Sequence, residues 1–485
     1  MRRTLEASRL GPLLPVMILC GSVSISILAG CGNDSTSPPP PSGPYSEEIQ
    51  PIFTQSCIDG CHSPGVPSVD SRNLDLTSWE GMTLGSSSGE VVIAFRPDQS
   101  HLISHISGDF IPQMPLSLDP LPDEQIERLR AWILDGARND AGEAPYEDLQ
   151  RKIYVANQGS DEVSVLSLDN LLVTRIVTVG SIPQTESPHN IWLDQPGDRW
   201  YVTMISAGKL EQYDAATDSF IARVDVGTLP ANGVTSEDGS TVYITNWDEN
   251  DQETGTVQIV DAATMTVTGT IQVGGQPHGI AISADGTRLY TTNYYSDDVS
   301  VVDLTQDPPV QLYTIPVAPD AGPLNPRQYL PNEVVISKDG RFLFVVLFGV
   351  GKSDLRVLDL AGDSLYTVIP TGGRGFLADI NPDGDELYVA DWSSRSVTVI
   401  NTTTMQREVT LTDSGFVNPH GVAFTPDGRY ALVTNENLSG DAPPAHHCAA
   451  ACDDIGNITI IDTATRQVVK KIDLEKQSAG IAVKY

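Results

Sequence analysis

The sequence predicts a mainly β protein, a seven-bladed β-propeller preceded by a small α-helical domain. Two observations predict the propeller: a pair of β-rich motifs recurs seven times between residues 151 and 485, and Asp-Gly pairs precede most copies. A third observation predicts the helical domain. Apolar residues at helical spacing flank a Gly-, Ser- and Pro-rich stretch between residues 45 and 140.

The repeat that starts at residue 151 has two elements. The first reads Tyr-Val-Ala-Asn at 154–157, and its copies start at residues 154, 201, 243, 290, 344, 388 and 432, at intervals of 42 to 54 residues. The second reads Val-Ser-Val-Leu at 163–166 and has a counterpart after every copy of the first. Asp-Gly pairs, as at 238–239, are strong hairpin signals. Four short strands per repeat, seven times over, predict a β-propeller.

The ends of the array predict how the ring closes. The array begins at a second strand, at Lys152, and ends on a first-strand motif at 479–483 that matches residues 278–282. The final strand, within 478–485, is therefore expected to complete the first blade. The repeats resemble the YVTN family of β-propellers over about 335 residues. This resemblance implies the fold and says little about activity, because propellers host many functions.

Residues 1–30 have the pattern of a secretory signal peptide. Three arginines precede a mostly apolar run, 13–28, which ends in small residues before Cys31. This end resembles the lipobox of bacterial lipoproteins, which implies cleavage before Cys31 and a lipid anchor on its sulfur. Residues 31–44 would then be a Pro- and Ser-rich tether. Gly32 stands after the cysteine in place of Asp, which for proteobacterial lipoproteins implies the outer membrane, so the expected location is its periplasmic face or the cell surface. The alternative is an uncleaved membrane anchor.

The predicted helical domain covers residues 45–140. A short helix is expected over 46–56, with three apolar residues on one face: Ile49, Ile52 and Phe53. A second helix is expected after Pro122, with Asp123 as its cap and Gly136 as its stop. Its apolar face would consist of Ile126, Leu129 and Ile133.

Cys57, Cys61 and the directly following His62 form a haem c attachment pattern. In this pattern two thiols add to the haem as thioethers and the adjacent imidazole coordinates the iron. The usual spacing places two residues between the cysteines. Here three residues separate them, so one must loop out. The alternative is a small disulfide between Cys57 and Cys61, with His62 as a bystander.

Met114, which precedes Pro115, is the expected sixth ligand of the iron. A thioether on an irregular loop commonly fills this position, and Met/His ligation raises the reduction potential. The competing ligands are Met82, His101 and His105. The alternative role for Met114 is ordinary core filling.

These residues resemble the small class I cytochrome c domains, especially the planctomycete-type variety. The resemblance covers about a fifth of the chain and is carried by five stretches: 49–53, 57–62, 100–102, 114–115 and 132–137. It implies one covalent haem c, with His62 as the proximal and Met114 as the distal ligand.

The charge of the chain excludes some partners. There are 29 Lys and Arg residues against 63 Asp and Glu, a formal net charge of −34. Without residues 1–30 the counts are 26 and 62, and the net charge is −36. A surface this acidic repels nucleic acid and anionic lipid, and it favours a redox partner with a basic docking surface.

One residue of each predicted inner strand is expected near the mouth of the propeller channel: His189, Asn232, His278, Asn332, Phe376, His420 and Ala479. The three histidines among them are spread almost evenly around the ring, and imidazoles on a common axis can bind copper or zinc. The favoured alternative is a solvated polar channel, because no carboxylate or cysteine at matching positions completes a metal site.

The seventh repeat carries an insert, 436–456, with two histidines and two cysteines: His446, His447, Cys448 and Cys452. A Cys448–Cys452 disulfide is the favoured reading in an oxidising compartment. Metal binding by the two histidines and the two cysteines is the alternative. The acidic stretch 248–253 reads as a solvated loop, since its spacing does not match a calcium loop.

Three functions follow as hypotheses. The first is a membrane-tethered electron carrier that binds haem c, with the propeller as a docking or substrate-binding module. The second is an oxidoreductase whose propeller holds its own metal or quinone site. The third is a non-redox surface binding or adhesion propeller.

Overall fold

The computed structural model describes residues 44–65, 72–116, 118–181, 185–247, 253–319, 327–352, 354–438 and 455–485. All of them belong to one compact unit, 41–485. The predicted signal peptide, Cys31 and the tether lie outside the described residues, as does most of the insert after β25. None of the helices in the described part is long and apolar enough to cross a membrane.

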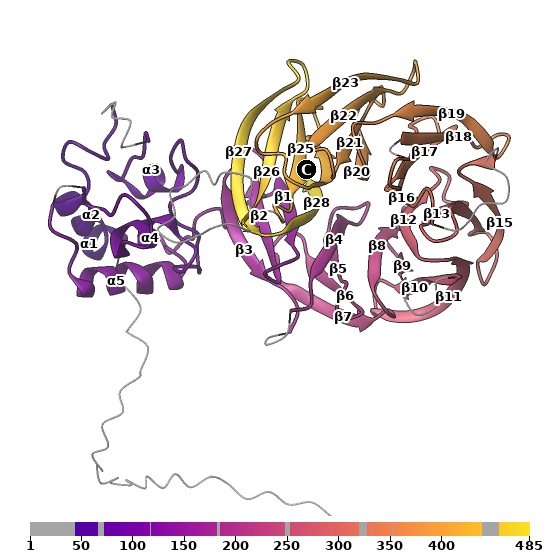
Figure 1. The fold of residues 1–485 in the computed structure, drawn as a ribbon. Coiled ribbons are helices and arrows are strands. Elements are labelled where there is room, and N and C mark those ends of the chain that lie inside the picture. Colours follow the sequence, from indigo (N-terminus) through magenta and orange to yellow (C-terminus); the bar gives the residue numbers. More distant parts are fainter. Residues whose placement is uncertain are drawn as a thin grey trace, which may run out of the picture. The chain divides into compact units, whose positions relative to one another are not determined.

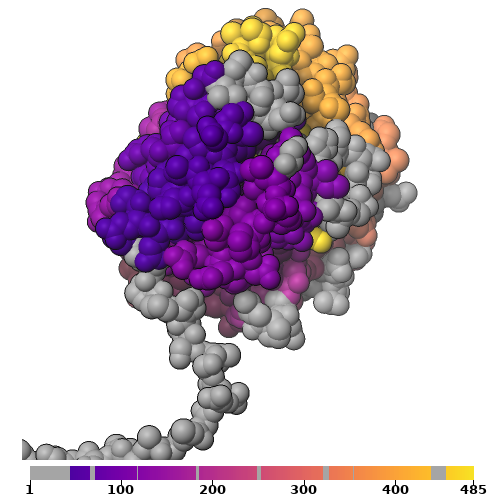
Figure 2. All heavy atoms as spheres, turned by 90° about the vertical axis from the view of Figure 1, so that its left-hand side faces the viewer, coloured from indigo at the N-terminus to yellow at the C-terminus, as the bar shows by residue number. Residues whose placement is uncertain are grey.

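The helical region has five helices among the described residues (Figure 1): α1 (Tyr45–Glu48), α2 (Gln50–Ser56), α3 (Trp79–Thr83), α4 (His101–Ser107) and α5 (Asp123–Leu134). The expected helix over 46–56 is thus two short helices that meet at Ile49. Ile49, Phe53 and Leu129 are fully buried in one core with Trp132 and Ile133. Figure 2 shows the surface of this region in indigo and purple.

The predicted cap of α5 is wrong. Pro122 occupies the N-cap position, Asp123 is the first helical residue, and no side chain accepts a capping hydrogen bond. Asp123 and Glu124 instead place negative charge in the first turn, where the helix dipole favours it. The predicted stop is correct, because Gly136 has a φ of +105°, a conformation that costs glycine little.

The strands β1 to β28 form seven four-stranded antiparallel sheets, as predicted (Figure 1). Blade 1 consists of β28 (Ser478–Lys484), β1 (Lys152–Asn157), β2 (Glu162–Ser167) and β3 (Val173–Thr178). Blades 2 and 3 consist of β4 (Pro188–Leu193), β5 (Arg199–Met204), β6 (Lys209–Asp214), β7 (Phe220–Asp225), β8 (Pro230–Thr235), β9 (Thr241–Asn246), β10 (Thr254–Asp261) and β11 (Thr266–Gly274).

Blades 4 and 5 consist of β12 (Pro277–Ile282), β13 (Arg288–Asn293), β14 (Asp298–Asp303), β15 (Val310–Pro316), β16 (Pro331–Ile336), β17 (Phe342–Leu347), β18 (Asp354–Asp359) and β19 (Ser364–Pro370). Blades 6 and 7 consist of β20 (Gly375–Ile380), β21 (Glu386–Asp391), β22 (Ser396–Asn401), β23 (Gln406–Thr412), β24 (Pro419–Phe424), β25 (Tyr430–Asn435), β26 (Ile455–Asp462) and β27 (Gln467–Lys476).

The Asp-Gly turns join the first and second strands of the blades, as the repeat predicted. In blade 3, Gly239 has a φ of +70° and its amide donates to the carbonyl of Ser236. The Asp238 carboxylate accepts hydrogen bonds from both the amide and the hydroxyl of Ser240. The turn therefore satisfies its own polar groups, which is why this short signal recurs so regularly.

The predicted ring closure is confirmed. β28, the last strand of the chain, pairs antiparallel with β1, the first strand of the array, with Lys484 opposite Lys152 and Val483 opposite Ile153. A hydrogen bond of 3.0 Å from the hydroxyl of Ser478 to the side-chain oxygen of Asn157 adds to the pairing. The two ends of the array therefore complete one blade together.

The helical region contacts the seam that this closure creates. Ile93 belongs to an apolar cluster that also contains Ile153 of blade 1 and Ile460 of blade 7. Arg96 forms an ion pair with Glu162, and Tyr146 accepts a hydrogen bond of 2.7 Å from Asn170. The helical region and the propeller thus share a small apolar core with polar contacts around it.

Candidate functional site

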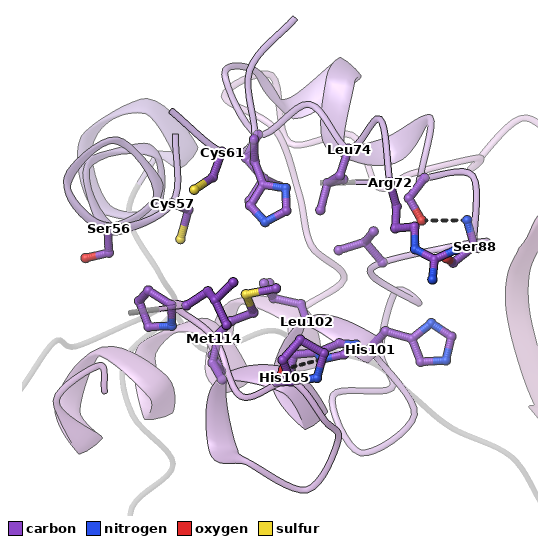
Figure 3. Close-up of a pocket in the computed structure, with 18 of the residues that line it drawn as sticks. Ser56, Cys57, Cys61, Arg72, Leu74, Ser88, His101, Leu102, His105 and Met114 are labelled. Carbon is purple, nitrogen blue, oxygen red and sulfur yellow. Dashed lines mark hydrogen bonds between the residues drawn. The ribbon is translucent and has the colours of Figure 1, made fainter. Parts of the chain in front are cut away.

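The four residues expected to bind haem line one cavity of about 360 Å³ in the helical region: Cys57, Cys61, His62 and Met114. Figure 3 shows Cys57 and Cys61 on one wall and Met114 across the space, with its sulfur pointing into the cavity. More than fifty residues separate Met114 from the cysteines in the sequence. The fold therefore places Met114 at the same cavity as the Cys57–His62 loop, although the two are far apart in the sequence.

The end of α2 positions the first wall. Cys57 follows the helix, and its amide donates to the carbonyl of Phe53 at 2.8 Å. The amide of His62 donates back to the carbonyl of Cys57 at 3.1 Å, which closes the loop between them. Gly60 takes a φ of +74° within this loop and has open space beside it. The additional residue of the motif is thus accommodated in a turn that glycine adopts readily.

Both cysteines of this loop are free thiols in the structure. Burial, with a smaller contribution from the neighbouring Cys61, raises the pKa of Cys57 to about 11. Cys57 is therefore protonated at neutral pH. A protonated thiol reacts more slowly with oxidants than a thiolate does. The alternative disulfide between these two residues is not formed here.

The opposite wall comes from α4 and the segment after it. The amide of Met114 donates to the carbonyl of His105 at 2.9 Å, which holds the methionine against the helix. His105 and His101 also line the cavity, and the Nδ1 atom of each ring contacts a main-chain carbonyl, of Pro112 at 3.0 Å and of Glu90 at 2.8 Å. Met82, the fourth candidate, lies in the core and does not line the cavity.

The cavity between these walls is mostly apolar, with Leu74, Leu76, Val91, Leu102 and Ile106 among its lining residues. Its size and lining are typical of sites that enclose a cofactor. An imidazole and a thioether that line one cavity, with two thiols on the same loop as the imidazole, suit a flat metal-containing ring that is both coordinated and covalently held.

A second cluster lies at the centre of the propeller. The seven residues expected near the channel mouth all stand on the inner strands β4, β8, β12, β16, β20, β24 and β28. The ring centre of His189 lies 5.3 Å from that of His420 and 5.8 Å from that of His278. The ring centres of Phe376 and His420 are 4.0 Å apart. The structure therefore brings the three histidines together on the axis.

Burial keeps these histidines neutral. Desolvation lowers the pKa of His189 to about 4 and that of His278 to about 3, and it lowers the pKa of His420 well below its usual range. Among the described residues, no group of three or more His, Cys, Asp or Glu side chains is arranged to hold a metal ion. Copper or zinc at these histidines stays a hypothesis, and so do the roles of His446, His447, Cys448 and Cys452, which the structure does not describe.

Sequence reasoning missed a ring of side chains above the histidines, which we call the mouth ring. Each member directly follows a second strand of a blade: Gln158, Ile205, Trp247, Tyr294, Phe348, Trp392 and Glu436. Each of these strands ends opposite the first residue of its inner strand, as in the pairs Asn246 with Pro230 and Asn435 with Pro419. Aligning the residue after each first-element motif would have found this ring.

Glu436 of the mouth ring places a carboxylate beside the histidines, which the sequence analysis had not expected. Its Oε1 atom lies 4.0 Å from Nε2 of His420, and its Oε2 atom accepts a hydrogen bond of 2.7 Å from the indole of Trp392. Burial raises the pKa of Glu436 to about 7. Sequence reasoning had compared only the inner strands, and this residue comes from the neighbouring strand.

Deeper in the channel, Glu333 is buried and accepts hydrogen bonds from Asn232 and from the amide of Val334. Desolvation raises its pKa from 4.5 to about 8. Because the folded pKa exceeds the unfolded one, the stability that Glu333 contributes is full below pH 4.5 and is lost as pH rises to about 8.

The variant Glu333→Gln should therefore gain stability relative to the wild type as pH rises from 4.5 to 8, and the difference should level off above pH 8. Thermal unfolding across this range measures it, with Glu237→Gln as a control outside the channel. A difference in melting temperature that does not change with pH would contradict the buried, proton-binding carboxyl.

Comparisons with known proteins support the propeller. Residues 204–365 match the family model "Lactonase, 7-bladed beta-propeller". Antigen Lp49 of Leptospira interrogans serogroup Icterohaemorrhagiae serovar copenhageni (strain Fiocruz L1-130) is 24% identical over 160 residues, which cover 32% of this chain and 34% of that protein. The matched stretch thus spans about a third of the relative.

Two solved structures are also similar. A functionally unknown protein from Desulfotomaculum acetoxidans DSM 771 has a TM-score of 0.55 at 14% identity, covering 69% of this chain and 99% of that one. Hydrazine synthase of Kuenenia stuttgartiensis has a TM-score of 0.49 at 20% identity, covering 62% of this chain and 93% of that one. Together with the seven sheets, the lactonase-type match and the first of these structures identify residues 151–485 as a seven-bladed β-propeller similar to that family.

Proposed function

We propose that the chain is an extracytoplasmic c-type cytochrome that transfers electrons. Residues 45–140 would be a class I cytochrome c domain with one haem c. Cys57 and Cys61 would hold the haem by thioethers, with His62 and Met114 as the iron ligands. The observation that carries the proposal is the single cavity in which these four side chains meet.

The residues of the cavity fit this group. The two thiols and His62 share one short loop, so attachment and coordination would occur on the same side. The sulfur of Met114 enters from the other side, and apolar side chains line the space between. When bound, haem supplies reversible one-electron chemistry at its iron, and Met/His ligation raises the potential. The protein's part is to exclude water from the apolar cavity and to hold the two ligands in place.

The propeller would then serve as a docking or substrate-binding module. The acidic chain favours a redox partner with a basic surface. Cys31 would carry a lipid that anchors the protein to the membrane, on the periplasmic face of the outer membrane or at the cell surface. An oxidoreductase with a metal site of its own is the second candidate, and the axial cluster of three histidines is the observation that favours it. A non-redox binding propeller would need no haem at all.

Replacing Met114 tests the proposal. The variant Met114→Ala should keep its haem, lose the weak sulfur-to-iron charge-transfer absorption in the far red, and have a potential lower by on the order of 100 mV. Met82→Leu is the matched control, because Met82 lies in the core and a swap of similar volume costs little. An unchanged spectrum in Met114→Ala would move the ligand role to His101 or His105, and a wild-type protein without haem would contradict the proposal.

A further inference from the structure

Four aromatic side chains follow one another along the mouth ring: Trp247, Tyr294, Phe348 and Trp392. We call them the aromatic crescent. Adjacent ring centres lie 4.4, 6.5 and 5.7 Å apart, so the crescent is continuous over blades 3 to 6. Trp247, Phe348 and Trp392 are only partly buried, so part of each side chain stays accessible. A contiguous run of accessible aromatic side chains is a candidate ligand-binding surface.

A second aromatic layer lies beneath the crescent. Phe376 stands 5.4 Å from Phe348, and His278 stands 5.7 Å from Trp247, each ring nearly perpendicular to its partner. The guanidinium group of Arg374 lies over the ring of Phe348 at 3.8 Å and over that of Trp392 at 6.0 Å, and it donates a hydrogen bond to the carbonyl of Phe348. The crescent is therefore fixed from below and from one side, which preorganises it for a flat ligand.

His420 provides an independent sign of a missing ligand. It is 1% exposed, and neither of its ring nitrogens has a hydrogen-bond partner among the described residues. A buried polar group left in this way costs free energy unless something satisfies it. Its Nε2 atom is 4.0 Å from Oε1 of Glu436, too far for a direct bond. One oxygen atom at about 2.8 Å from both would bridge the gap.

We propose that this end of the channel binds a hydroxylated aromatic ring, with the ring against the aromatic crescent and the hydroxyl between His420 and Glu436. A hydroxyl group suits the position because it donates one hydrogen bond and accepts others. A neutral imidazole and a carboxyl group offer both a donor and an acceptor to match it. A water molecule could fill the same gap but would not account for the accessible parts of Trp247, Phe348 and Trp392. The site is in the propeller and does not depend on haem attachment.

Equilibrium dialysis of the full chain, with its cofactor loaded, against 2-naphthol tests the proposal. One molecule should bind per chain. The methyl ether 2-methoxynaphthalene should bind at least about tenfold more weakly, because it cannot donate a hydrogen bond. Cyclohexanol, which has the hydroxyl but no flat ring, should not bind measurably at the same concentrations. Equal binding of naphthol and its ether would overturn the assignment of the hydroxyl.

Variants locate the site. Trp392→Leu and His420→Asn should each weaken naphthol binding by about tenfold. Tyr366→Leu is the matched control, because Tyr366 is an exposed aromatic residue on the outer strand β19 and should bind as the wild type does. Circular dichroism checks the fold of each variant. Binding that survives both channel variants, or no binding to the wild type, would overturn the proposal and would leave the haem proposal untouched.

Discussion

Removing the last eight residues, 478–485, should leave the propeller insoluble or lower its melting temperature by more than about 10 °C. The truncation deletes β28, so β1 loses its inner partner and blade 1 loses its place on the axis. Unpaired strand edges also promote aggregation. Chain ends normally tolerate losses of this length, so a large effect would be informative.

The packing around β28 explains why so few residues matter. The hydroxyl of Thr434 in blade 7 donates to the carbonyl of Ala479, and Lys484 donates to the carbonyl of Ala215 in blade 2 at 2.9 Å. A side chain added at Gly480 would come within 2.8 Å of the backbone at His189 and Asn190 of the neighbouring blade. The strand β28 thus contacts blades 7 and 2 in addition to its pairing within blade 1.

Deletion of Tyr485 alone is the control, because this residue is 84% exposed and lies beyond β28. Its loss should shift the melting temperature by less than about 1 °C. A soluble chain without 478–485 that melts as the wild type does would mean that the ring closes in another way.

The second large effect is expected at Asp218. This carboxylate is buried and accepts hydrogen bonds from Lys152 at 2.9 Å, from the hydroxyl of Tyr154 at 2.9 Å and from Arg175 at 3.0 Å. Lys152 is itself only 2% exposed, and burial lowers its pKa while Asp218 opposes this shift. The variant Asp218→Ala would leave that ammonium group buried without a counter-charge.

Asp218→Ala should therefore cost about 3–5 kcal/mol of unfolding free energy and lower the melting temperature by about 10 °C. The matched control is Asp225→Ala, which breaks an ion pair with Lys209. The side chain of Asp225 is 82% exposed, so this variant should cost less than about 1 kcal/mol. The double variant Lys152→Met, Asp218→Leu should recover most of the loss, since it removes both buried charges. A loss at Asp218 no larger than at Asp225 would contradict a buried ion pair.

Most of the propeller was predictable because its signals are local. The blades repeat the same alternation of apolar residues, and most of them repeat the same Asp-Gly turn, so many copies of a weak signal become a strong one. The closing strand was predictable for the same reason, since residues 479–483 copy residues 278–282. The predicted cap of α5 was wrong by one position, because a sequence pattern locates the ends of a helix less precisely than the helix itself.

The sites were predictable only where one short motif names its residues. Cys57, Cys61 and His62 stand together in the sequence, and Met114 was selected as a methionine on an irregular loop downstream of them, a choice that the resemblance to cytochrome c domains supported. The burial of Lys152 was not foreseen, because its partner Asp218 lies on a loop of the next blade. The mouth ring was missed because its members share a position in the blade and not a residue type. Glu436 and Trp392 become one site only when blades 6 and 7 pack side by side.

Covalent haem on the full-length chain tests the central claim most directly. After expression in a bacterium that attaches haem c, the purified chain is denatured, extracted with acidified acetone and examined by intact mass and pyridine haemochrome spectrum. The account predicts one haem per chain that stays with the protein and shows a c-type spectrum, and its loss from the double variant Cys57→Ser, Cys61→Ser. Haem that passes into the acetone, or a chain that carries no haem and no iron, would contradict it.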